Sequence, residues 1–286
     1  MFSQTRKQVK KVGLPPGTLT YTGDKNLNPP VFNLIQYNSK DIQETKNATL
    51  EDCITPPTIP GITWINVEGL NDVALIEKLG KNFHLHPLTI EDILNVQQRP
   101  KVEEFEGYLF ITLKLIYWDG KGAKFAIKQL SIVMGKNFVL TFQEEPSQLF
   151  TGLQTRLKAT NSQRMREHGS DYLVYRLIDT VVDEYFVILE AMGDQIEIVE
   201  EKIITDPTSQ NARTIYRLKR KMLVLRKAIW PMREAVSHLL NTEEEFITKF
   251  TRVYMRDVYD HVAQVIDTFE TFRDMLSGII SEWAHV

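Results

Sequence analysis

Acidic side chains at three separate places in the sequence could together bind a hard divalent cation. They are Glu91 and Asp92, Asp179 and Asp183, and Asp257 and Asp260. Mg²⁺ is bound through oxygen atoms, keeps several of its waters and usually takes one or two carboxylates from a protein. Residues four apart lie on one face of a helix, so Asp179 shares a face with Asp183, and Asp257 shares one with His261. Periodicity alone does not join the three groups into one site.

Each acidic group also has a plainer explanation. The Glu91–Asp92 pair, which we expect at the start of a short helix, would favour a helix N-terminus through the macrodipole. The Asp179–Asp183 pair is typical of a solvated helix face. Asp257 follows Arg256, and an exposed ion pair of this kind contributes little to stability. The charges by themselves therefore leave a metal site and an ordinary charged surface both open.

Histidines offer imidazole ligands for a borderline metal such as zinc. His84 and His86 are two residues apart at an expected junction of loop and helix, and His261 lies in the last helix. Zinc sites of this kind usually add cysteines, and no cysteine cluster is present. A structural role is therefore favoured for the histidines.

The composition excludes several classes of function. The chain has 286 residues, of which 43% are hydrophobic and 25% charged, as in a soluble globular protein. Its net charge of −3 gives no basis for a nucleic-acid partner. One cysteine, Cys53, cannot form an internal disulfide, which indicates a reducing compartment. No glycine-rich phosphate loop, Gly-x-Ser-x-Gly or Cys–His signature appears, so we do not expect an enzyme.

The order of the expected elements predicts an α+β fold. Strands are expected at 31–37, 64–67, 108–117, 125–134 and 138–142, and helices at 71–83 and from Pro87 onward. From Ser147 the pattern is almost entirely helical. We therefore predict an α/β/α sandwich with a mixed sheet at 1–165, an antiparallel helical hairpin at 166–241 and a long stalk helix at 242–286.

The last helix has the most regular apolar pattern of the chain. Thr242 with Glu245 suits a helix start, because the two can form a capping box. The apolar residues then step by threes and fours, as a heptad seam does: Met255, Val258, Val262, Val265, Phe269, Phe272, Leu276 and Ile279. Such a seam either packs on the protein's own core or forms a self-associating stalk. It reaches nearly to the end without a stop signal, so we expect a longer helix cut short.

The two helices before it carry opposite charge. The segment 190–206 holds six acids against Lys202 alone, and the segment 213–233 holds eight basic residues and no acid. Joined by a short turn, the two helices are expected to lie antiparallel and to pair across the hairpin. The alternative is that the acidic surface concentrates divalent cations.

Five dispersed segments together resemble one protein family. They are VGLPPGTLTYTG (12–23), HPLTIEDILNVQQRPKVEEFEGYLFITLKLI (86–116), YRLIDTVVDEYF (175–186), IWPMRE (229–234) and RDVYDH (256–261). In this order they look like the cytosolic part of the CorA family of magnesium channels. The Gly-Met-Asn of that family, at the end of its first membrane helix, is not in this sequence. Nor is any apolar stretch of the roughly 18 residues needed to span a membrane.

The resemblance implies a function and a set of site residues. It implies a homopentamer whose long terminal helix leads to two C-terminal membrane helices, in the cell inner membrane, with this portion on the cytoplasmic side. It also implies magnesium transport, with cobalt or nickel as substitutes. Of two metal sites between subunits, one would pair Asp92 with a neighbour's Asp257, and the second would add Glu91 and Asp179.

Bound Mg²⁺ would then hold the closed state, and its loss would let the subunits move apart. Two alternatives stay open: a zinc-transporting relative with the same architecture, and a soluble helical scaffold with no transport role.

Overall fold

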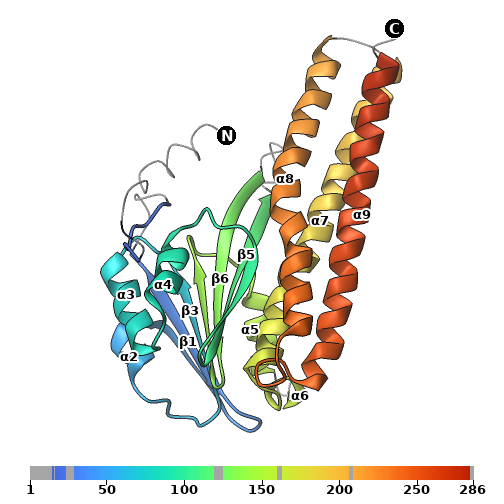
Figure 1. Ribbon diagram of the computed structural model, residues 1–286. Coiled ribbons are helices and arrows are strands. Elements are labelled where there is room, and N and C mark those ends of the chain that lie inside the picture. The colour runs from blue at the N-terminus through green and yellow to red at the C-terminus, as the bar shows by residue number, and fades with distance from the viewer. Residues whose placement is uncertain are drawn as a thin grey trace.

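The protein is described by a computed structural model that covers Pro15, 17–23, 29–118, 125–159, 163–205 and 209–283. The expected turns at Asp119-Gly120 and Asp206-Pro207 lie outside these residues. The molecule has a sheet-containing part and a tall bundle of three long helices that continues beyond the end of the sheet (Figure 1).

Seven strands form one mixed sheet. They are β1 (Val31–Tyr37), β2 (Ile42–Ala48), β3 (Ile62–Glu68), β4 (Lys101–Phe105), β5 (Tyr108–Trp118), β6 (Phe125–Gly135) and β7 (Phe138–Gln143), in the order β2-β1-β3-β7-β6-β5-β4. Only the central β3–β7 pair is parallel, and the other neighbours are antiparallel. In β3 every residue from Ile62 to Val67 is buried, which is expected of a central strand covered on both faces.

The sheet has edge strands that its apolar pattern did not reveal. β2 reads IQETKNA and β4 reads KVEEF, and both leave several residues exposed. Edge strands pair on one side only and often carry charged residues. The sequence therefore predicted the five inner strands, whereas these two polar ones were missed.

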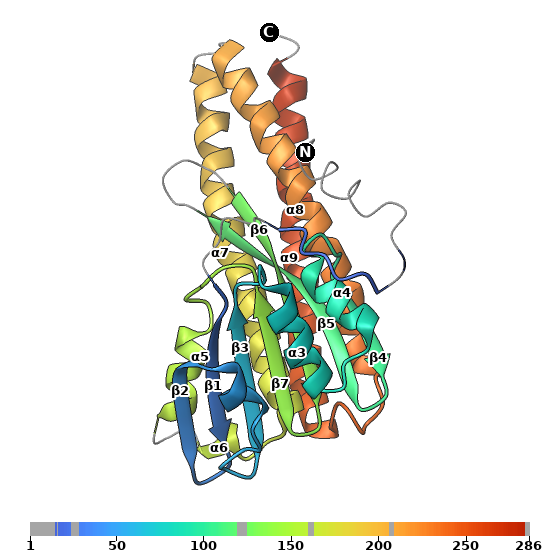
Figure 2. The same ribbon diagram turned by 90° about the vertical axis from the view of Figure 1, so that its left-hand side faces the viewer.

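Helices cover both faces of the sheet. They are α2 (Leu50–Ile54), α3 (Val73–Asn82), α4 (Pro87–Leu94), α5 (Thr151–Lys158), α6 (Gln163–Arg166), α7 (Ser170–Thr205), α8 (Ser209–Asn241) and α9 (Lys249–Trp283). One core joins α2, α3 and α4 to one face of the sheet. A second, larger core joins the other face to α5 and the three long helices. Figure 2 looks onto the face that carries α3 and α4. This is the predicted α/β/α sandwich.

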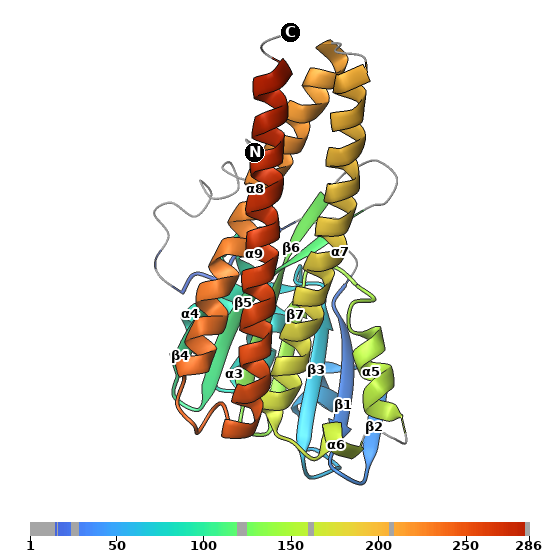
Figure 3. The same ribbon diagram turned by 90° about the vertical axis from the view of Figure 1, so that its right-hand side faces the viewer.

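The heptad seam of α9 is buried inside the chain. Met255, Val258, Val262 and Leu276 have no exposed surface. They share a core with apolar residues of α7 and α8. α9 packs closely against both of these helices, which contact each other much less (Figure 3). The structure therefore agrees with the first interpretation of the seam, in which it packs on the protein's own core.

The predicted start of the last helix at Thr242 was wrong. Residues 242–248 form turns, and α9 begins at Lys249. The hydroxyl of Thr242 donates instead to the backbone oxygen of His238 at 3.0 Å and to Glu104 at 3.2 Å. Thr248 caps α9, because its side chain accepts from the backbone N–H of Thr251 at 3.3 Å.

Candidate functional site

The pair Glu91 and Asp92 lies in the second half of α4. The helix starts at Pro87, whose missing N–H costs nothing in a first turn, and His86 caps it by accepting from the N–H of Leu88 at 3.2 Å. The expectation that the two acids stand at the start of the helix was wrong. Near a C-terminus the macrodipole disfavours negative charge, so helix stability does not explain these carboxylates.

Asp92 is held by neighbouring side chains. Its Oδ2 is 2.6 Å from the ammonium of Lys101 on β4, and its Oδ1 accepts from the amide of Gln98. Lys101 also reaches Glu103 at 2.8 Å. Burial works against the charged form of Lys101, but its hydrogen bonds to Asp92 and Glu103 outweigh burial and raise its pKa. A cationic group therefore already stands at the Asp92 carboxylate.

Glu91 faces the N-terminal segment. Its Oε2 accepts from the backbone N–H of Gly17 at 2.8 Å. Gly17 has a positive φ of 80°, a conformation that glycine adopts without a Cβ penalty. This contact ties the segment near Gly17 to the metal-ligand candidates of α4.

Asp179, Asp183 and His261 gather between α7 and α9. One ligand atom from each lies within 4.8 Å of the others. Asp179 is only 9% exposed and pairs with Arg176 at 2.9 Å. Burial raises the pKa of Asp179, Arg176 opposes the rise, and the nearby carboxylate of Asp183 adds to it. A cation bound at this group would oppose the rise in the pKa of Asp179, as Arg176 does.

Asp257 stands next to this group, on the surface. Its side chain is 67% exposed, and its Oδ2 lies 3.9 Å from Nε2 of His261. One turn earlier Val253 is 64% exposed, although it is apolar. Asp257 therefore presents its carboxylate to whatever lies outside this face of the chain, and it has an exposed apolar neighbour.

The predicted ligands fall into two groups on opposite faces of the sheet. Glu91 and Asp92 belong to α4, whose apolar side packs in one core, whereas Asp179 and Asp257 belong to helices of the other core (Figure 1). The structure brings Asp179 and Asp257 together, with Asp183 and His261. It does not bring Asp92 to Asp257 within one chain.

Two other histidines, His86 and His238, have structural contacts. His86 caps α4, and its ring stacks on Phe105 with centroids 5.7 Å apart. Near the far end of α8, Nε2 of His238 lies 3.1 Å from Glu104. Among the histidines considered from sequence, His261 alone stands in a cluster with carboxylates in the described part of the chain.

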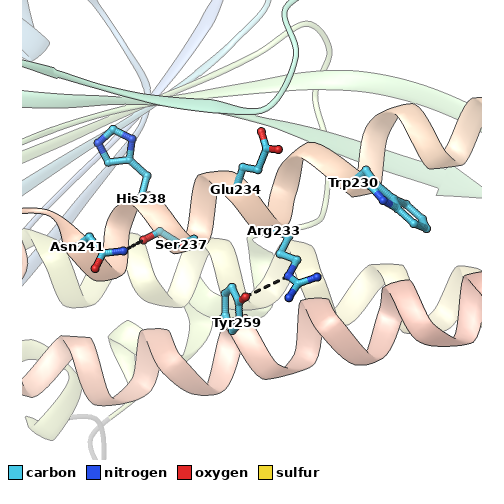
Figure 4. Close-up of a pocket in the computed structure, with 7 residues that line it drawn as sticks. All are labelled: Trp230, Arg233, Glu234, Ser237, His238, Asn241 and Tyr259. Atoms are coloured by element: carbon cyan, nitrogen blue, oxygen red, sulfur yellow. Dashed lines mark hydrogen bonds between the residues drawn. The ribbon is translucent and has the colours of Figure 1, made fainter.

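A groove along α8 contains none of the predicted ligands. It has a volume of about 650 Å³ and is lined by Trp230, Arg233, Glu234, Ser237, His238, Asn241 and Tyr259. Figure 4 shows Glu234 and His238 on the side of α8 toward the strands, while Arg233 points to Tyr259 on α9. The guanidinium donates to the Tyr259 hydroxyl at 3.0 Å. The lining mixes both charges, so it does not select one kind of ligand.

The fold agrees with the sequence comparisons. The model of the CorA-like Mg2+ transporter protein family matches residues 60–286. The chain is 41% identical over 279 residues to the cobalt/magnesium transport protein CorA of Thermotoga maritima, covering 98% of this chain and 79% of that protein. The chain belongs to the CorA-like Mg²⁺ transporter family, which is a family of transporters and not of enzymes.

Solved structures share the fold at low sequence identity. The complete CorA magnesium transporter of Methanocaldococcus jannaschii has a TM-score of 0.75 and 19% identity, over 91% of this chain and 78% of that one. The cytoplasmic domain of ZntB from Vibrio parahaemolyticus has a TM-score of 0.69 and 13% identity, over 89% of this chain and 97% of that one. No helix among the described residues is both long and apolar enough to cross a membrane.

Proposed function

We propose that this chain is the magnesium-sensing, cytoplasmic part of a CorA-type divalent-cation channel that takes up magnesium through the cell inner membrane. Cobalt, which is named for the Thermotoga relative together with magnesium, would be a second cargo. The proposal rests on family membership and on one observation. The carboxylates Asp92 and Asp257, which the resemblance pairs in one site, lie on opposite faces of the same chain.

A site made of these two residues needs a second copy. Asp257 is exposed and lies beside the exposed Val253, as expected of a residue that meets a partner. The acids of α4 stand where the helix dipole disfavours them, so helix stability does not explain them, and the ammonium of Lys101 shows that Asp92 attracts a cation. Repeating one such contact around an axis gives a closed ring, and we propose a homopentamer.

The donor set fits a hard cation. Asp92, Glu91, Asp179 and Asp257 supply carboxylate oxygens only, which is the chemistry that Mg²⁺ prefers. Asp183 and His261, which join Asp179, add a second carboxylate and an imidazole. An imidazole suits cobalt, nickel or zinc better than magnesium, so this cluster supports the cobalt substitution. It is also the observation that favours the zinc-transporting alternative.

The mechanism follows from charge. Facing carboxylates repel each other when they are bare, and a divalent ion between them removes this repulsion and links the subunits. In the free chain Lys101 partly neutralises Asp92, and Glu103, 2.8 Å away, can retain the ammonium when Asp92 turns to the ion. Loss of Mg²⁺ at low cytosolic concentration would release the subunits and favour the open pore.

Melting temperature with and without Mg²⁺ tests the proposal. Millimolar-range Mg²⁺ should raise the melting temperature of the parent, because a ligand that binds only the native state stabilises it. Asp92→Asn and Asp257→Asn should each reduce this rise. Asp274→Asn is the matched control, since Asp274 is on α9 too and its side chain is 71% exposed. If Mg²⁺ stabilises all four proteins equally, these residues are not the ion clamp.

A further inference from the structure

The outer surface of α7 carries a long acidic stripe. Its members are Val187, Glu190, Asp194, Glu197, Ile198 and Glu201, all of them exposed. Apart from the adjacent Glu197 and Ile198, they follow one another at intervals of three or four residues, so they lie along one face of the helix. Val187 is 56% exposed and Ile198 50%. Both apolar side chains therefore stand uncovered among the acids.

The exposed surface of α8 carries a basic stripe of the same kind. Its members are Arg213, Tyr216, Arg217, Arg220, Leu223, Val224 and Lys227, again all exposed. Apart from the adjacent pairs Tyr216–Arg217 and Leu223–Val224, the spacing is again three residues. Tyr216 is 57% exposed, Leu223 58% and Val224 42%. Both stripes thus combine charge of a single sign with uncovered apolar surface, a combination found at protein interfaces.

The charges of the two stripes lie at matching distances from the end of the hairpin where α7 ends and α8 begins. Glu201 lies four residues before Thr205, where α7 ends, and Arg213 lies four residues after Ser209, where α8 begins. Each residue adds about 1.5 Å along a helix. The acid and the arginine are therefore at the same level of the hairpin.

The next two positions continue the match. Glu197 and Arg217 are each eight residues from those same helix ends, and Asp194 and Arg220 are each eleven. Three acids thus face three arginines in register, if the two surfaces are laid side by side with their helices antiparallel.

Within one chain these charges do not pair. α9 packs against both α7 and α8, and these two contact each other little. Figure 3 shows α9 in front, with α8 and α7 on either side of its lower part, while higher up α8 passes behind α9 toward α7. Among the described residues, none of the charged side chains of the two stripes makes an ion pair, and the apolar members remain uncovered. The expected pairing across the hairpin is therefore not what the structure has.

We propose that the acidic stripe of one copy docks on the basic stripe of a second copy. The contact joins two different surfaces, so the first copy keeps its basic stripe free and the second copy keeps its acidic stripe free, and repetition closes a ring. When the axis of such a ring runs parallel to the helices, neighbouring copies are not shifted along them. Residues at the same distance from the hairpin end then meet, as the matched charges require. An acidic membrane would attract the basic stripe but repel the acidic one, and it would not explain the register.

The inference names a partner surface for the assembly of the proposed function, but it involves none of the metal-ligand candidates. The seam of α9 is buried within its own chain, so the two stripes, and not the seam, would provide the contact between copies. The stripes supply association by charge and apolar contact, which should weaken with salt, whereas the carboxylate sites supply association by metal.

Cysteine cross-linking of the full chain tests the proposal. The one native cysteine, Cys53, is 3% exposed, so the background is low. A chain with both Glu197→Cys and Arg217→Cys should give dimers and longer ladders with a short bis-maleimide in EDTA at low salt. The control chain combines Glu197→Cys with Lys227→Cys, which differ in height by about 15 Å, and should give several-fold fewer.

Each outcome decides the matter. Ladders from the matched chain alone support docking between copies. A matched chain that only cross-links internally overturns the proposal in favour of pairing within the hairpin, and equal or absent ladders from both chains overturn it as well. Ladders that form while Mg²⁺ leaves the melting temperature unchanged would contradict the proposed function and leave this interface standing. If Mg²⁺ raises the melting temperature but no ladders form, the proposed function would stand and this interface would be overturned.

Discussion

The carboxylate of Asp171, at the start of α7, accepts from both the backbone N–H and the hydroxyl of Thr248, at 3.0 and 2.7 Å. Thr248 is the residue that caps α9. Asp171 is only 4% exposed, so this pair fixes the base of α9 to α7 in a largely dry environment. It also sets the position of Asp257, about two turns further along α9.

Asp171→Ala should therefore destabilise the fold. A hydrogen bond to a charged group contributes about 2 kcal/mol, and the alanine would leave the donors of Thr248 without their acceptor. Denaturation by urea at neutral pH measures the change. Asp274→Ala, at an exposed position of the same helix, should cost less than about 0.5 kcal/mol. An equal loss in both variants would remove the special role given to Asp171.

Lys101→Met should strengthen magnesium binding. The ammonium stands 2.6 Å from Asp92 and competes with a divalent ion for that carboxylate. Since a partly exposed ion pair is worth about 1 kcal/mol, the dissociation constant should fall by about fivefold. Titration calorimetry with Mg²⁺ measures it, and Lys128→Met serves as the control because Lys128 pairs with Glu145. Weaker binding by Lys101→Met would mean that Lys101 supports the site.

Asp179→Asn should stabilise the metal-free chain near neutral pH. The surroundings raise the pKa of Asp179, chiefly by burial, so they favour a neutral side chain in the folded state. The gain should shrink as pH falls toward 4, because the parent carboxyl is then protonated too. Melting curves in EDTA show this, and Co²⁺ should stabilise the variant less than the parent. A destabilised variant at neutral pH would mean that the Arg176 pair dominates.

Stability should rise with pH through the titration of Lys114. Burial lowers the pKa of this residue to about 8 in the folded chain. Between that value and the ordinary pKa near 10.4, the unfolded chain binds the extra proton, so raising the pH favours the folded state. Between pH 8 and 9.5 the difference between parent and Lys114→Met should change by about 2 kcal/mol. Parallel curves for the two proteins would show that Lys114 is charged in both states.

The strongly apolar parts of the fold could be predicted from the sequence, since burial leaves a period of two or of three to four residues. The inner strands, both helices of the hairpin and the seam of α9 were predicted in this way. β2 and β4 were not, because one-sided pairing lets an edge strand such as Lys101–Phe105 be polar. The start of α9 was misplaced because the Thr242 and Thr248 sites both offer a cap, and only tertiary contact with Asp171 selects Thr248.

The candidate site, like the fold, could be predicted from the sequence only in part. Sequence spacing placed Asp179 with Asp183 and Asp257 with His261, and the structure brings these four together. The ammonium of Lys101 at Asp92 depends on the pairing of β4 with β5, which the sequence did not indicate. The separation of Asp92 from Asp257 by the sheet follows from topology, and no local pattern encodes it.

The central claim is that Asp92 and Asp257 of different copies share one divalent ion, and mixing two variants tests it most directly. Sedimentation velocity would follow association of Asp92→Asn, of Asp257→Asn and of their equimolar mixture, with and without Mg²⁺. Each variant alone lacks half of every site, whereas the mixture can form contacts in which an intact Asp92 meets an intact Asp257. We predict that Mg²⁺ promotes association of the parent and of the mixture, but of neither variant alone. A mixture that responds no better than its components would contradict the shared site.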